Sequence, residues 1–531
     1  MSNPKPNIIF IIADDIGIAD LGSYGGKAVP TPHLDQMAQE GMRFTQFYSG
    51  CSVCAPSRSV LTTGQHMGHT AVRGNSGGIP LRAEDVTVAE LLKKEGYTCG
   101  GFGKWGIGDI NTTGVPEKHG FDTFYGYYHQ VHAHTYYPKY LVRNSEKIYF
   151  EGNDNGDEGP THSHYPIYEE TLKFIRDNKD NPFFCYVPWT LPHGRHVLPA
   201  DEPALEQFKN KPWTDKEKIL AAMISLWDRH IGDVFALLKE LDIDDNTIVF
   251  VTSDHGAQPR ELGDFDRCGP YRGIKRTMYE GGIRTPFLVR WPNKIEAGTE
   301  SDYLGNFADV LPTLTNLVDT KTPDDTDGYT LLPTLLGQGK QQHHDYLYWE
   351  LPKYDFKNRQ FDPDGMIQAI RMQNWKGVRN STTGPAATLA KKMTSHPSDQ
   401  TLKTNSKRTL KKPEKNPIYK LNPITQKDSD TINPVLTQEL ACHNPPTSSS
   451  SSPTIKVMQT SVLMLTRQVI SQHLTWTALP TKASSSHKPT SPLLSAVPHV
   501  PDGIPDAINN AGMAGVGTSV YQTTPKRSLN I

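Results

Sequence analysis

The chain has 531 residues, and its 55 Lys and Arg against 57 Asp and Glu give a formal net charge of -2. This balance excludes a nucleic-acid-binding protein that relies on bulk positive charge, and six cysteines are too few for a disulfide scaffold. No apolar run approaches the length needed to cross a bilayer, so the sequence predicts no membrane span.

The first structural element is the apolar stretch from Ile8 to Ala13, which acidic residues follow directly. It is too short for the core of a secretory signal, and it favours a buried parallel strand instead. With no export signal visible, the sequence as written favours the cytoplasm, or the periplasm or a secreted location if its N-terminus is a processed form.

Expected strands and helices then alternate through the first 380 residues. The expected helices run from Pro32, capped by Thr31, to the stop at Gly41, from 86 to 95 with a stop at Gly96, and from 216 to 241. The expected strands start at Tyr97 and span 183–188 and 247–253. This alternation predicts an α/β domain with a mostly parallel central sheet flanked by helices.

Acidic residues follow two of these strands. Asp14 and Asp15 come after the first strand, and Asp254 and His255 come after strand 247–253. Ligands of parallel sheets bind beyond the carboxyl ends of the strands, where such carboxylates would converge on a hard cation such as Ca²⁺ or Mg²⁺. The alternative is that these residues only cap the helices that follow.

The stretch CSVCAPSRSVLTTG, residues 51–64, contains Cys54, Pro56 and Arg58 in a Cys-x-Pro-x-Arg pattern. Taken alone, Cys54 would be a small buried hydrophobic residue. The whole stretch, however, resembles the signature of the type I sulfatases. In that family the cysteine is oxidised to formylglycine, an aldehyde that hydrates to a gem-diol, so the resemblance implies a maturation enzyme, either formylglycine-generating or radical.

Further stretches resemble that family in the same order. They are GYTCGGFGKWGIG with Lys104, TLPHGRH with His193, TIVFVTSDHG with Asp254, and RGIKRTMYEGGIRTP with Lys275. The resemblance covers residues 6 to 376. It implies an alkaline-phosphatase-like fold and hydrolysis of aryl or carbohydrate sulfates, with a sulfated small molecule or saccharide as substrate.

The resemblance also implies roles for individual residues. The Ca²⁺ or Mg²⁺ ligands would be Asp14, Asp15, Asp254, His255 and the oxidised Cys54. Lys104, Lys275 and His193 would bind sulfate, whose charge is spread over three oxygens, and Arg58 would pair with the hydrated residue and the carboxylates. In isolation, the two lysines would be surface residues and His193 an ordinary turn residue.

The sequence departs from the family at Gly106, because the family usually shows Lys-Trp-His where this chain has Lys104, Trp105 and Gly106. The missing histidine normally assists deprotonation of the formylglycine hydroxyl. His132 and His134 are the nearby substitutes, and on an extended segment two residues apart they would point to one face. The alternative is that both are exposed loop residues.

The C-terminal part has a different composition. Residues 1–380 contain 38 of the 43 glycines and 50 of the 57 acidic residues, whereas 60 of the 120 residues from 381 to 500 are Ser, Thr, Pro or Lys. We therefore expect a catalytic domain at 1–376 and an atypical region at 377–531, either weakly structured or altered by a reading-frame change. The family usually ends in a small antiparallel sheet, which we expect to start at residues 374–379. Its loss would remove one wall of the substrate pocket.

Two other functions stay open at this stage. One is a catalytically weak relative that binds a sulfated ligand, because Gly106 and the C-terminal region have altered the site. The other is a phosphate or phosphonate monoester hydrolase with the same fold, since a fold does not fix a function.

Overall fold

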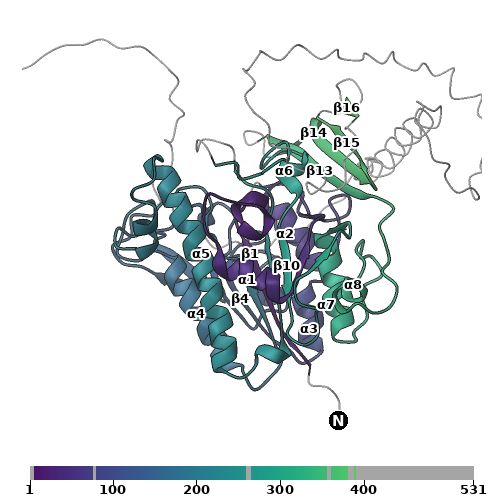
Figure 1. The fold of residues 1–531 in the computed structure, drawn as a ribbon, viewed down its shortest axis with the longest axis horizontal. Helices are drawn as coiled ribbons and strands as arrows, with labels where there is room; N and C mark the ends of the chain where they lie inside the picture. Colours follow the sequence, from purple (N-terminus) through teal and green to yellow (C-terminus); the bar gives the residue numbers. More distant parts are fainter. Residues whose placement is uncertain (1–4, 76–78, 259–264, 356–359, 381–387, 390–531) are drawn as a thin grey trace, which may run out of the picture. The chain divides into compact units, whose positions relative to one another are not determined.

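The computed structural model of the chain describes residues 5–75, 79–258, 265–355, 360–380 and 388–389. These residues form an α/β fold around a ten-stranded, mostly parallel sheet (Figure 1). In spatial order the strands are β11 (Thr299–Ser301), β2 (Met42–Phe44), β10 (Phe287–Arg290), β9 (Thr247–Ser253), β1 (Asn7–Ala13), β8 (Phe183–Val187), β4 (Thr98–Lys104), β5 (Thr123–Tyr127), β6 (Tyr140–Arg143) and β7 (Glu146–Tyr149). The predicted fold class is confirmed.

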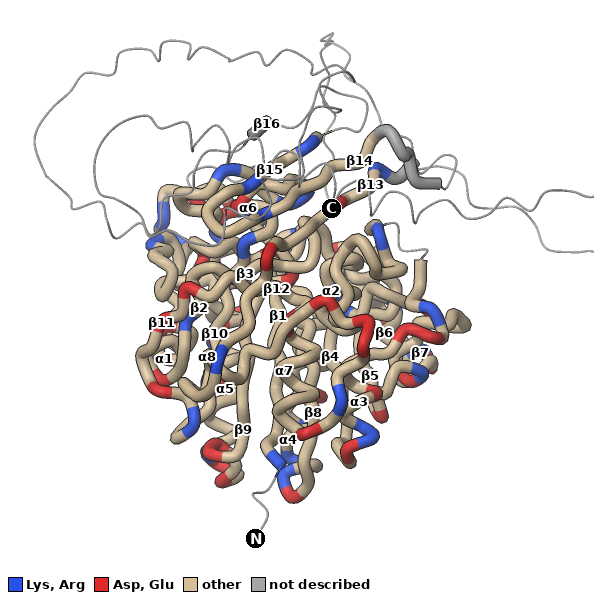
Figure 2. The backbone as a smooth tube through the Cα atoms, turned by 90° about the vertical axis from the view of Figure 1, so that its right-hand side faces the viewer, with Lys and Arg blue, Asp and Glu red and all other residues tan. Residues whose placement is uncertain are grey.

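The centre of the sheet consists of the parallel strands β9, β1, β8, β4 and β5. β1 and β9 pair along their whole length, from Asn7 opposite Thr247 to Ala13 opposite Ser253. Every residue of both strands is buried, and neither strand contains a charged side chain. Figure 2 shows this as strands without red or blue, with the charged residues gathered around the strand ends. Strands covered on both faces are expected to be continuously apolar in this way.

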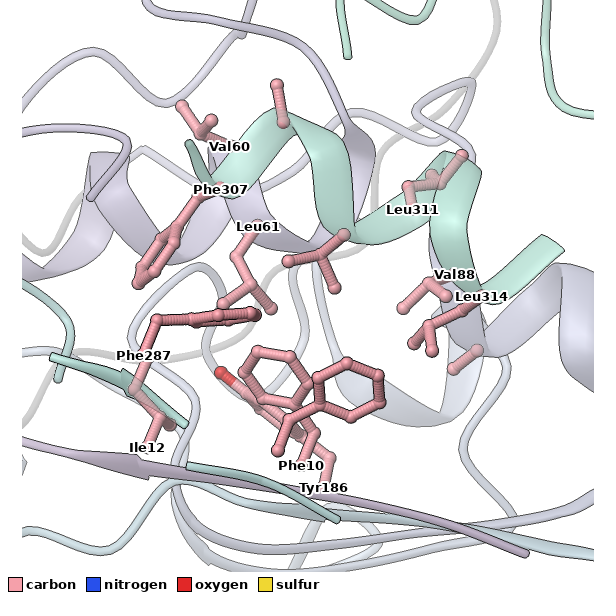
Figure 3. Close-up of a cluster of buried hydrophobic side chains, with 14 of the residues drawn as sticks. Phe10, Ile12, Val60, Leu61, Val88, Tyr186, Phe287, Phe307, Leu311 and Leu314 are labelled. Carbon is pink, nitrogen blue, oxygen red and sulfur yellow. The ribbon is translucent and has the colours of Figure 1, made fainter. Parts of the chain in front are cut away.

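Helices cover both faces of the sheet. One layer contains α1 (Pro32–Glu40), α4 (His164–Asp177) and α5 (Asp215–Glu240), and the other contains α2 (Cys54–Thr63), α3 (Val88–Lys94), α7 (Val310–Leu317) and α8 (Leu332–Leu336). Successive β1 side chains alternate between the two layers, as the period of a strand requires. Phe10 and Ile12 face the second layer, where they lie with Leu61 of α2 and Leu314 of α7 (Figure 3). No helix in the described ranges is long and apolar enough to span a bilayer.

The three predicted helices correspond to α1, α3 and α5, with boundaries within two residues of the predicted ones, but the caps differ. Thr31 precedes α1 as predicted, yet its hydroxyl accepts the Gly22 N–H at 2.9 Å and caps no helical N–H. The start of α3 is fixed by Thr87, which forms a reciprocal capping box with Glu90. The side chain of a predicted cap residue can thus bond to a neighbouring loop and not to its own helix. The local sequence does not show which of the two occurs.

A small antiparallel sheet lies beyond the carboxyl ends of the parallel strands (Figures 1 and 2). Its strands are β13 (Leu347–Asp355), β14 (Gln360–Met372), β15 (Trp375–Arg379) and β16 (Thr388–Leu389). The expectation that residues 374–379 start this sheet is wrong, because they form its third strand. The expected domain boundary at 376/377 falls within β15, and the prediction for residues 390–531 lies outside the described residues.

This small sheet packs against the stretch that leads to α2. The Trp349 indole N–H donates to the Ser49 carbonyl at 2.8 Å, and the Cys51 thiol lies 3.6 Å from the Glu350 carbonyl oxygen. Lys376 forms a buried ion pair of 2.7 Å with Glu280, the first residue of α6 (Glu280–Ile283). The small antiparallel sheet is therefore present in the described residues, and it is anchored to the segment that precedes α2 and to the start of α6.

Candidate active site

The acidic residues that follow β1 and β9 lie side by side. Because Ala13 pairs with Ser253, the next residues of both strands emerge at the same edge of the sheet. The Asp15 N–H donates to Asp254 Oδ1 at 3.2 Å. Asp15 has a φ of 74°, which is uncommon for a residue other than glycine. The convergence expected from the strand positions is confirmed, and the helix-cap alternative does not account for it.

Cys54 starts α2 and enters the same place. Its Sγ lies 3.5 Å from Asp14 Oδ1 and 3.3 Å from His255 Nε2, and the thiol is fully buried. The helix start is anchored by the Ser57 hydroxyl, which donates to the Asp254 carbonyl at 2.6 Å. If Cys54 is oxidised to the hydrated aldehyde, its Sγ stands where one of the two hydroxyl oxygens would be.

Four of these residues form what we call the strand-end cluster: Asp14, Asp15, Cys54 and His255. One potential ligand atom from each lies within 4.8 Å of all the others. His255 Nδ1 lies 2.8 Å from the Gly256 carbonyl oxygen and therefore carries the proton that this oxygen accepts, so Nε2 faces the cluster. Two carboxylates, together with the hydroxyl that an oxidised Cys54 would carry, suit a divalent cation, although an imidazole is less usual for Ca²⁺ or Mg²⁺.

Asp254, the fifth predicted ligand, lies outside this group of four. Its Oδ2 accepts from Arg58 Nη2 at 3.0 Å, while its Oδ1 lies 3.5 Å from His255 Nε2. Burial and the neighbouring Asp14 raise the pKa of Asp254. Of the two contacts, the one with Arg58 is the shorter.

Arg58 is fully buried and connects the two sides of the site. Besides Asp254, it contacts Asp14 Oδ2 at 3.6 Å and donates through Nη1 to the Lys104 carbonyl at 2.7 Å. A guanidinium has a fixed fork of donors, which suits this set of acceptors. Burial alone would raise the pKa of Asp14, but Lys104, His193 and Arg58 outweigh burial and lower it well below its usual range. Asp14 is therefore ionised at neutral pH.

The three predicted sulfate ligands converge on the same cluster. Lys104 Nζ lies 2.7 Å from Asp14 Oδ2, and Lys275 Nζ lies 2.6 Å from Asp15 Oδ1. His193 Nε2 lies 3.7 Å from Asp15 Oδ2. All three side chains are buried. The alternative, in which the two lysines are surface residues and His193 is an ordinary turn residue, is therefore wrong.

His255 is also subject to strong electrostatic forces. Burial lowers its pKa, but Asp254 and Cys54 outweigh burial and raise the pKa to about 9. A cation and a proton would therefore compete for Nε2, which is the usual coupling between metal binding and ligand protonation.

The predicted histidines His132 and His134 separate. The segment forms the short 3-10 helix η4 (His132–His134) and not an extended strand, so residues two apart point in different directions. His134 stacks on His193 with ring centroids 4.7 Å apart, whereas His132 packs against Tyr140 at 4.6 Å. The expectation that both rings share one face is wrong. Among the described residues, the Cys54 thiol contacts Asp14 and His255 and neither of these histidines.

Sequence reasoning missed two glutamines that belong to the site. Gln258 donates through its side-chain amide to Asp15 Oδ2, and Gln130 Nε2 lies 3.3 Å from His134 Nε2. Gln258 lies three residues after His255, a position that could have indicated it. Gln130 lies three residues after β5, a strand that was not predicted from the sequence, and it belongs to none of the family signatures. We call Gln130, His134 and His193 the loop cluster.

Comparison with known proteins agrees with this geometry. Residues 6–320 match the sequence model of the family described as Sulfatase, and residues 272–385 match the one described as N-sulphoglucosamine sulphohydrolase, C-terminal. The second match ends near the change in composition at residue 381 and includes most of the small antiparallel sheet.

Individual relatives give the same result. The chain is 34% identical over 372 residues to N-acetylgalactosamine-6-sulfatase of Homo sapiens, which covers 65% of this chain and 68% of the relative. It is 32% identical over 426 residues to arylsulfatase A of Homo sapiens, with 74% and 80% covered. The crystal structure of Ps i-CgsB in complex with k-i-k-neocarrahexaose is similar with a TM-score of 0.62 at 25% identity, covering 73% of this chain and 86% of that chain.

Proposed function

The chain belongs to the sulfatase family and is a sulfuric ester hydrolase, and from this premise we propose that it cleaves aryl or carbohydrate sulfates through Cys54 oxidised to formylglycine. The observation that supports this most directly is the position of Cys54. It lies buried at the start of α2, in contact with Asp14 and His255. A structural cysteine would not need two ionisable neighbours whose cluster is itself paired with Lys104 and Lys275.

The residues of the chain fit the charges of the reaction. A sulfate monoester carries one negative charge over three oxygens, and its transfer needs a nucleophile in line with the leaving oxygen. Hydrated formylglycine at residue 54 would supply that nucleophile as one hydroxyl, and its second hydroxyl would allow release of sulfate by return to the aldehyde. Lys104 and Lys275 would stabilise the equatorial oxygens, because ammonium groups fixed in a buried site need little rearrangement as charge develops.

The strand-end cluster would hold a divalent cation, Ca²⁺ or Mg²⁺, with Asp254 as a further ligand. Such a cation supplies positive charge next to the sulfate and orients it. Arg58 keeps Asp14 and Asp254 in place through contacts of 3.6 and 3.0 Å. His193, whose Nε2 lies 3.7 Å from Asp15 Oδ2, would contact a sulfate oxygen.

A sulfated saccharide is the substrate class that the relatives favour. One relative is named N-acetylgalactosamine-6-sulfatase, and one similar structure contains a neocarrahexaose. The two buried lysines fit any sulfate monoester.

The test is to measure the mass of the peptide that contains Cys54, after expression with a formylglycine-generating enzyme. We expect conversion to the aldehyde and turnover of an aryl sulfate or of sulfated saccharides, with much slower cleavage of aryl phosphates and phosphonates. Cys54→Ser is the matched control, because a serine would form a sulfate ester that it cannot release. Unconverted Cys54 in a host that matures other sulfatases would instead identify a sulfate-binding relative without turnover.

A further inference from the structure

Gly106 leaves a space in the site that another side chain fills. A Cβ atom placed on Gly106 would lie 2.8 Å from Gln130 Oε1, 3.7 Å from Arg58 Cδ and 3.9 Å from Lys104 Cε. The Gly106 N–H donates to the Tyr128 carbonyl at 3.0 Å, which aligns this glycine with the chain just before Gln130. The amide of Gln130 therefore lies where a side chain at position 106 would enter the site.

Among the described residues, the Gln130 amide has one hydrogen-bond partner on its nitrogen and none on its oxygen. The residue is fully buried, and its Nε2 lies 3.3 Å from His134 Nε2. An amide nitrogen can only donate, so His134 Nε2 must accept and the ring proton must be on Nδ1. Within the described ranges, Gln130 Oε1 has no hydrogen-bond partner. A buried carbonyl oxygen without a partner is costly, which indicates that a donor reaches it in the working site.

His134 transmits this contact to the sulfate-binding side of the site. Its ring lies on that of His193, with centroids 4.7 Å apart and planes inclined by 17°. His193 in turn approaches Asp15 of the strand-end cluster at 3.7 Å. Burial, and after it the charge of Lys104, lowers the pKa of His134 to about 4, so the ring is neutral and able to accept from Gln130. The contacts form one continuous path from Gln130 to Asp15.

We infer that Gln130 is a positioning residue that takes the place of a side chain at position 106. Its N–H holds His134 in one tautomer against His193, and its Oε1 accepts a hydrogen bond from a hydroxyl group in the site. The inference rests on the proposed function for its kinetic consequences, but the geometry of His134 can be measured without turnover.

The first experiment compares Gln130→Leu with the matched control Gln36→Leu, which changes an exposed glutamine on α1. With an aryl sulfate as probe, Gln130→Leu should lower kcat roughly 10- to 100-fold with little change in KM, the range for loss of one or two buried hydrogen bonds. Gln36→Leu should have wild-type kinetics. A Gln130→Leu enzyme with wild-type kcat would overturn the inference.

A second experiment exchanges the two positions. Gly106→His alone should be harmful, because the new Cβ would lie too close to Gln130 Oε1. In a chain that also carries Gln130→Ala, the same Gly106→His change should raise kcat above that of Gln130→Ala alone. The φ of 81° at Gly106 is one that histidine tolerates better than most residues. If Gly106→His improves the enzyme while Gln130 is present, the two side chains do not share one place and the inference is wrong.

The third readout separates this inference from the proposed function. Selectively ¹⁵N-labelled histidine, assigned with His134→Gln, should show His134 as the Nδ1–H tautomer in the wild type and as a mixed or altered tautomer in Gln130→Leu. The peptide mass of residue 54 is measured on the same samples. Failure of aldehyde formation contradicts the proposed function alone, whereas an unchanged His134 signal in Gln130→Leu contradicts the role of Gln130 alone.

Discussion

The strand-end cluster and the loop cluster face the same site but are built differently. In the strand-end cluster, each residue follows β1 or β9 directly or starts α2, so regular backbone hydrogen bonds fix its position. In the loop cluster, the residues come from η4, from the turn before it and from the turn after β8, where side-chain contacts fix them. Regular elements preserve a recognisable pattern in the sequence, whereas loops let an unrelated residue such as Gln130 take over a position.

The sharpest way to test the first cluster is to remove its nucleophile. Cys54→Ala should lower kcat/KM on the order of 10⁴-fold or more, because loss of a nucleophile removes the covalent route altogether. Cys51→Ala is the matched control, since Cys51 is a buried cysteine three residues earlier and contacts the Glu350 carbonyl. It should reduce the melting temperature slightly and keep kcat. Comparable activity in the two variants would contradict the assignment of Cys54.

The lysines that pair with the strand-end cluster should give the next largest effect. Lys104→Ala and Lys275→Ala should each lower kcat about 10²-fold or more, because each faces charge that develops on the transferred group. Lys173→Ala, which breaks an exposed pair with Asp177, should change neither kcat nor, by more than about 1 kcal/mol, the free energy of unfolding. Steady-state kinetics on an aryl sulfate measure all three. Near-wild-type turnover in either of the first two would return that lysine to a structural role.

Within the loop cluster, the two histidines should differ. His134→Ala should lower kcat about 10-fold through loss of its contacts to Gln130 and His193, a change of about 1.4 kcal/mol in the barrier. His132→Ala should keep kcat and lower the melting temperature, because His132 packs against Tyr140 and Tyr127 and not against His193. The reverse order of the two effects on kcat would show that the short helix η4 presents the other ring to the site.

The smallest effect concerns acid stability and His132. Burial lowers its pKa from 6.5 to about 4, so the folded state binds its proton less readily than the unfolded state does. Its contribution to stability is therefore fully present above pH 6.5 and is lost as the pH falls towards 4. His132→Phe keeps the aromatic contacts and cannot be protonated. Its melting temperature relative to wild type should therefore rise as the pH falls from 6.5 to 4. A constant difference between pH 7 and pH 4 would show that this ring stays accessible to protons.

The sequence by itself determined the fold class, the family and most of the strand-end cluster. Buried parallel strands such as β1 and β9 read as uninterrupted apolar runs, and their carboxyl ends fall at one edge by the geometry of the sheet. The residues that follow these strands are Asp14, Asp15, Asp254 and His255. They could therefore be placed together from their spacing and from the signature around Cys54. The limits of α1, α3 and α5 followed from their apolar periodicity and stop residues.

Only the tertiary structure decided the remaining assignments. The role of Thr31 depended on the distant N–H of Gly22, and Gln130 gained its position because the chain after β5 folds back beside Gly106. Likewise, η4 separated His132 from His134, which an extended segment would have kept on one face. Contacts between loops depend on where each loop's end is anchored in three dimensions. Local propensity carries little of that information, because side-chain contacts of this kind lack the period that marks strands and helices.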